Sequence, residues 1–92
     1  MNFENLSSHL LANEPPRSQP FIEGMAAVLR NRVDQTPVTS PYSAGTADDD
    51  AFFAGRMRGH NEFRNLLIEH HGDRQAVIAH LRDVCASIRR AA

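Results

Sequence analysis

The apolar residues of this chain recur mainly at intervals of three and four, which is the repeat of an α-helix. No segment alternates apolar and polar residues in the way that a half-buried strand does. The clearest stripe lies in a helix expected from Arg74 to about Arg90 and follows i, i+4, i+7, i+11 spacing: Val77, Leu81, Val84, Ile88. The pattern therefore predicts an all-α protein.

Helix-capping residues and prolines delimit the other helices. A short helix is expected over residues 2–14, where Pro15 and Pro16 end it. Ser18 is a good N-cap for a second helix, with Pro20 in its first turn, where a missing N–H costs nothing. Residues 1–34 should thus hold two short helices.

The rest of the chain is expected to be a loop followed by a helical hairpin. Residues 35–46 are rich in Pro, Ser and Thr and favour a loop. Thr46 is positioned to cap a long helix up to about His70, and Asp73 to cap the last one. The short connection between these two helices predicts antiparallel neighbours. We expect one domain of about four helices, centred on the hairpin of residues 47–92.

The long helix carries several apolar residues that are expected to face the core. One broad face of this helix holds Phe53, Met57, His60, Phe63, Leu66, Leu67 and His70, and Phe53 and Met57 are expected in the core. Phe52 cannot share a narrow stripe with its neighbour Phe53. It either covers the first two helices, which we favour, or anchors an interface.

Two glycines in this helix indicate a close approach by another helix. Gly55 and Gly59 lie four residues apart, and each costs up to about 1 kcal/mol relative to alanine inside a helix. The compensating neighbour can come from the same chain or from a second subunit. We therefore predict a protein interface on this helix, formed by Phe52, Gly55, Arg56, Gly59 and Arg64.

Two further features are candidates for binding. Arg56, His60 and Arg64 form an i, i+4, i+8 stripe that could meet phosphate or carboxylate groups, although a solvated face explains it more simply. The loop that contains Pro41 and Tyr42 is a second candidate contact.

Composition narrows the possible partners. The 92 residues hold ten arginines, no lysine and 11 acidic residues, for a net charge of −1, so nucleic acid is a possible but not a favoured partner. No apolar run is long enough for a membrane span, and the N-terminus lacks the features of a secretory signal. The single cysteine, Cys85, suits a reducing compartment.

Catalytic and metal-binding patterns are missing from the sequence. The five histidines do not have zinc-ligand spacing, and Cys85 lies beside the apolar stripe of the last helix, where a thiol is usually a small core residue. No nucleophile elbow or phosphate-binding loop occurs. We expect no enzyme, no catalytic residue, no metal site and no cofactor.

Two resemblances meet around the start of the long helix. The segment Ser40–Thr46 followed by Ala51–Gly55 resembles the Pro-Tyr and aromatic-Gly pattern of small proteins related to ribosome modulation factor. A second group of residues is similar to a short helical domain of small tailed-phage proteins, several encoded near virion-assembly genes: Phe53, Gly55, Arg56, Gly59, Phe63, Arg64, Leu66 and Leu67.

These resemblances imply a phage or prophage protein, and with it a cytoplasmic location in the bacterial host. The expected function is a small, non-enzymatic virion or assembly component that binds itself or other virion proteins and is incorporated in the virion. The alternative is an accessory protein that binds a host factor, ribosome or nucleic acid through Arg56, Arg58 and Arg64 and the Pro-Tyr loop.

Overall fold

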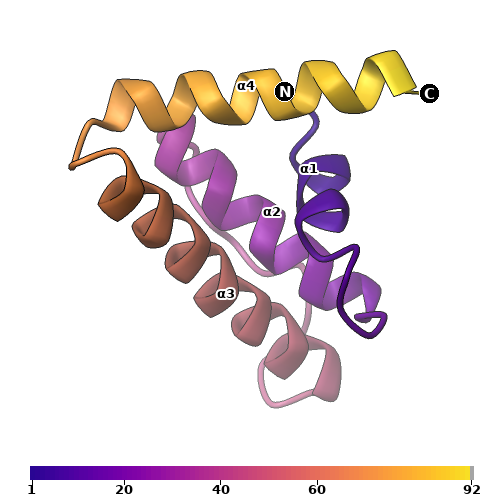
Figure 1. The fold of residues 1–92 in the computed structure, drawn as a ribbon. Coiled ribbons are helices and arrows are strands. Elements are labelled where there is room, and N and C mark those ends of the chain that lie inside the picture. Colours follow the sequence, from indigo (N-terminus) through magenta and orange to yellow (C-terminus); the bar gives the residue numbers. More distant parts are fainter. Residues whose placement is uncertain (92) are drawn as a thin grey trace.

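The computed structural model describes residues 1–91, which form four α-helices and no strand (Figure 1). The helices are α1 (Phe3–Leu10), α2 (Gln19–Asp34), α3 (Ala47–Glu69) and α4 (Arg74–Ala91). The predicted all-α class is confirmed, and so is the number of helices. α1 is shorter than expected, since the chain leaves the helix at Leu11, before the two prolines.

Side-chain caps begin all four helices. Thr46 Oγ1 accepts a hydrogen bond from the backbone N–H of Asp49 at 3.2 Å, and Ser18 Oγ accepts one from Phe21 at 3.4 Å. The carboxylate of Asp73 accepts from the N–H of Ala76, and the side chain of Asn2 caps α1 in the same way. The caps predicted at Ser18, Thr46 and Asp73 are confirmed.

The centre of the fold is the pair α2 and α3, which lie side by side (Figure 1). Phe21 in α2 contacts Gly55 in α3, and Met25, one turn further along α2, contacts Gly59. Because the contacts advance in the same direction along both helices, α2 and α3 run parallel. Residues 35–46 return along their length to begin α3 where α2 also begins (Figure 1).

This arrangement corrects the prediction that the α3–α4 hairpin forms the centre. α4 crosses the ends of α2 and α3 and passes over α1 (Figure 1), so it touches α3 much less than α2 does. The connection includes His71 and Gly72, both with positive φ (57° and 80°). A short connection fixes which helix ends are neighbours, but the crossing angle is set by the faces that the helices bury.

The core is built from all four helices. Its buried apolar residues are Phe3, Leu6, Leu11, Phe21, Met25, Ala26, Leu29, Phe63, Val77, Leu81 and Cys85. α3 enters this core through Phe63, and Phe52 is also buried, with 3% of its surface exposed. Phe53 and Met57, expected in the core, are 57% and 49% exposed. Their assignment was wrong because α3 carries apolar residues on two sides, and α2 covers the side with the glycines.

Candidate functional site

The side of α3 opposite to α2 carries most of the exposed large apolar side chains. We define the outer face of α3 by its exposed residues Asp50, Phe53, Met57, Arg64 and Ile68. Four large hydrophobic side chains within residues 1–91 are strongly exposed, and three of them lie here: Phe53, Met57 and Ile68, the last 66% exposed. Scattered exposed apolar residues need no explanation, but a grouped set on one helix points to a contact surface.

Arginine flanks this apolar stripe. The guanidinium carbon of Arg56 lies 5.5 Å from the centroid of the Phe53 ring, in reach of a cation–π contact. Nε of Arg56 is buried without a hydrogen-bond partner within residues 1–91. Arg64 and Asp50 are exposed and form no ion pair among the described residues. Two charges of opposite sign are thus unpaired on this face, Asp50 before Phe53 and Arg64 between Met57 and Ile68.

The predicted interface residues divide between the two sides of α3. A Cβ added to Gly55 would lie 2.0 Å from the carbonyl oxygen of Phe21, and one on Gly59 would lie 3.0 Å from that of Met25. Phe52 is buried on the same side. Because α2 covers Phe52, Gly55 and Gly59, these three residues pack within the chain, which for Phe52 is the favoured of the two alternatives and for the glycines the same-chain one. Arg56 and Arg64 remain accessible.

The two loop residues predicted as a contact, Pro41 and Tyr42, also differ in their surroundings. The hydroxyl of Tyr42 donates a 2.7 Å hydrogen bond to Glu23 Oε1 of α2, and its ring meets Phe52 edge-on at 6.2 Å. That hydrogen bond and partial desolvation raise the pKa of Tyr42 to about 12. Tyr42 thus fastens the loop to the helix pair, whereas its neighbour Pro41 is exposed. The side chain expected to meet a partner is used within the fold.

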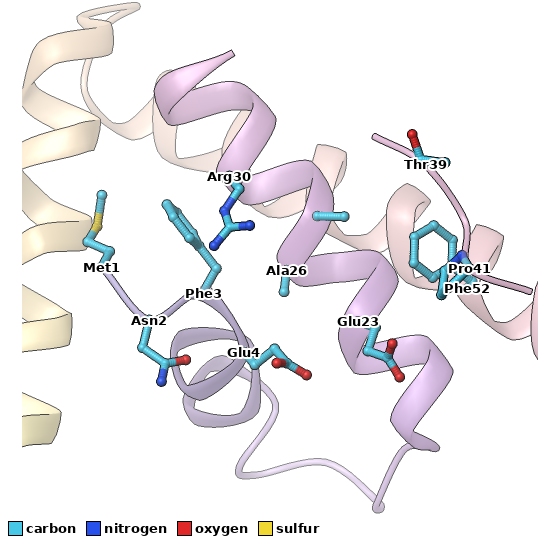
Figure 2. A pocket seen from close by; sticks show the side chains of 11 residues that line it. Met1, Asn2, Phe3, Glu4, Glu23, Ala26, Arg30, Thr39, Pro41 and Phe52 are labelled. Atoms are coloured by element: carbon cyan, nitrogen blue, oxygen red, sulfur yellow. The ribbon is translucent and has the colours of Figure 1, made fainter. Parts of the chain in front are cut away.

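A groove of about 600 Å³ lies between α1, α2 and this loop (Figure 2). Figure 2 shows Arg30 and Ala26 of α2 between the N-terminal segment and Phe52. Its carboxylates are already engaged, since Glu23 accepts from Tyr42 and Glu4 accepts from Gln19 Nε2 at 2.8 Å. The groove therefore lacks a set of free polar groups converging on one point.

Arg58 is held within the molecule rather than presented to a partner. Its guanidinium pairs with Glu14, before α2, and with Glu62 one turn along α3, at 2.8 Å for the latter pair. The hydrogen bond from Arg58 lowers the pKa of Glu14. Because Glu14 and Arg58 lie 44 positions apart, no local sequence pattern could have revealed this link.

The histidines and the cysteine form no larger cluster. His70 and His80 approach with ring centroids 5.7 Å apart, across the α3–α4 corner. Within residues 1–91, no group of three or more His, Cys, Asp or Glu side chains is placed to hold a metal ion. Cys85 is a buried free thiol, as its position beside the apolar stripe predicted.

Comparisons with protein-family models, with curated proteins and with solved structures find no match. None of the helices in residues 1–91 combines the length and the apolar character needed to cross a membrane. The outer face of α3 is therefore the feature of the chain that best indicates a function. Ile68 was not predicted as part of a surface, and Phe53 and Met57 were predicted in the core. The available signal was the second apolar stripe of α3, opposite to its glycines.

Proposed function

We propose that this protein acts by binding other proteins through the outer face of α3, without catalysing a reaction. The observation that carries the proposal is the grouping of Phe53, Met57 and Ile68, all at least 49% exposed, on one side of one helix. Aromatic residues, methionine and arginine are the side chains enriched in protein interfaces. The outer face has all three.

Arg56, which borders this face, supports a protein partner. Arg56 is stacked on Phe53, so less side-chain freedom is lost when both residues are covered. Binding of nucleic acid through Arg56, Arg58 and Arg64 is less favoured, because Glu14 and Glu62 hold the guanidinium of Arg58. A phosphate would have to compete with these two carboxylates.

The biological setting that we propose is the assembly of a tailed-phage virion in the bacterial cytoplasm. Its support is the resemblance carried by the segment from Phe53 to Leu67. Within that segment, Gly55 and Gly59 serve the packing on α2, while Phe53 and Arg64 lie at the surface. A segment of this kind can maintain the fold and present a binding face at once. The partners would be other virion proteins or further copies of the chain.

The proposal is tested with Phe53→Asp in a phage that encodes the protein. Because Phe53 is 57% exposed, the variant should keep its helical circular dichroism while a charge disrupts the outer face. We expect incorporation of the protein into purified virions, measured by quantitative mass spectrometry, to fall at least about tenfold, which is a loss of 1.4 kcal/mol in binding.

Ala79→Asp, at an exposed position of α4, is the matched control and should leave incorporation unchanged. Absence of the wild-type protein from purified virions would refute the virion setting. A folded Phe53→Asp variant that is incorporated like the wild type would refute the binding role of the outer face.

A further inference from the structure

The outer face of α3 is complementary in charge to a reversed copy of itself. Asp50, Met57 and Arg64 follow each other at intervals of seven residues. Seven residues are close to two helical turns, so these side chains share one line along the helix and lie about 10 Å apart along the axis. The acidic and basic ends are equally distant from Met57.

From this placement we infer that two copies of the chain pair through α3 in antiparallel orientation, about a two-fold axis at Met57. The inference rests on the proposed binding role of the outer face and names a second copy as its partner. A two-fold axis at Met57 brings Asp50 of each copy to Arg64 of the other. Two equivalent ion pairs then flank one apolar contact.

Two of the three exposed apolar residues of the outer face, Phe53 and Met57, fit the same pairing, whereas Ile68 lies beyond Arg64 and outside it. Met57 meets the same residue of the second copy on the axis, and its flexible side chain adapts to such a contact. Phe53 lies one turn away on the same face and packs against the second copy's Met57. Both residues, each about half exposed in one chain, would be covered.

Charge decides the direction of the pairing. In a parallel pair, Asp50 would face Asp50 and Arg64 would face Arg64, which is repulsive. Asp48, Asp49 and Asp50 also make the N-terminal end of α3 acidic, so two such ends repel each other when aligned. Antiparallel packing separates these ends and aligns the helix dipoles favourably.

The contact should be weak and depend on concentration. One helix pair of this length buries an area at the low end of specific interfaces. Dissociation constants of micromolar order are typical of such contacts. The dimer would therefore form where copies are concentrated, as in an assembling particle.

A charge exchange tests the inference by sedimentation equilibrium on the full chain at about 10 to 500 µM. We expect Asp50→Arg and Arg64→Asp each to weaken self-association at least about tenfold, and the double variant to recover to within about threefold of the wild type. High salt should weaken the wild-type dimer. Circular dichroism checks that each variant is folded.

Asp83→Arg and Arg82→Asp exchange charges at exposed positions of α4 and should have no effect on self-association. A wild type that stays monomeric up to the highest concentration, or a double variant that associates no better than the single ones, overturns the inference. If the chain is monomeric but Phe53→Asp still abolishes incorporation into virions, only the dimer is refuted. Binding through the outer face then stands, with another protein as the partner.

Discussion

Tyr42 shows how the side chain of a loop residue can be used in contacts within the fold. The composition of residues 35–46 predicts a loop, and Tyr42 was predicted to contact a partner. Its hydroxyl instead bonds to Glu23 and its ring lies against Phe52. Loop composition predicts the absence of regular structure, but it does not tell which side chains point inward.

The ionisation of Tyr42 can be measured directly, because the chain has one tyrosine and no tryptophan. Phenolate absorbance near 295 nm should rise with a pKa of about 12 in the wild type. In Glu23→Gln the pKa should fall towards the ordinary value of 10.0, since the carboxylate that disfavours the phenolate is removed.

The same shift has a consequence for stability. The pKa of Tyr42 is raised in the folded state, so its contribution is complete below pH 10.0 and is lost as the pH rises towards about 12. Tyr42→Phe should lack this part of the alkaline destabilisation. A wild-type tyrosine that ionises near pH 10 while circular dichroism still shows a folded chain would contradict the interpretation.

At the scale of the helices, the glycines decide how closely α2 and α3 approach. The four-residue spacing of Gly55 and Gly59 predicted a close helix contact and left open whether it came from the same chain. The structure shows that the neighbour is α2 and that Gly24 of α2 makes the reciprocal approach to Phe52. The sequence pattern could not name the partner, because any helix backbone can occupy a glycine face.

Replacing each glycine of α3 by alanine should have graded effects. The Cβ of Gly55→Ala would lie 2.0 Å from a backbone oxygen, which must shift, so we expect a loss of at least about 2 kcal/mol. In Gly59→Ala the Cβ would lie 3.0 Å from Met25 O, and the gain of up to about 1 kcal/mol in helix propensity offsets much of the strain.

Urea unfolding of the two variants provides the measurement, with Gly59→Ala as the matched control in the same helix. Equal destabilisation by the two substitutions, or a stable Gly55→Ala variant, would show that α2 is not held against α3 at this distance.

At the scale of the whole molecule, the connection of residues 35–46 allows the parallel arrangement of α2 and α3. Twelve extended residues span up to about 40 Å, whereas the 16 residues of α2 are about 24 Å long. The chain can therefore return along the helix pair before α3 begins. Hydrophobic periodicity cannot predict that α2 and α3 run parallel, because it indicates which face of a helix is buried and not the direction of the neighbouring helix.

The Arg58–Glu14 pair links the segment before α2 to α3. It also makes the free energy of unfolding depend on pH in the acidic range. The pKa of Glu14 is lowered from 4.5 by Arg58, so the pair contributes fully above pH 4.5 and is lost as the pH falls through the lower, folded value. The difference in unfolding free energy between the wild type and Glu14→Gln should therefore shrink below pH 4.5.

Comparing these two proteins by urea unfolding from pH 7 to pH 3 cancels the titration of the other carboxylates. A difference that stays constant over this range would mean that Glu14 does not act through its charge. Glu69→Gln, an exposed carboxylate without an ion pair among residues 1–91, is the control and should show little change with pH.

The sequence by itself determined the all-α class, the approximate extent of the four helices and three of their caps, since these depend on contacts within a few residues. It also marked α3 as the helix with close packing. Only the tertiary structure decided that α2 covers the glycine side, which buries Phe52 and leaves Phe53, Met57 and Ile68 exposed. The physical reason is that α3 offers two faces able to bury apolar surface, and the choice between them depends on groups distant in the chain.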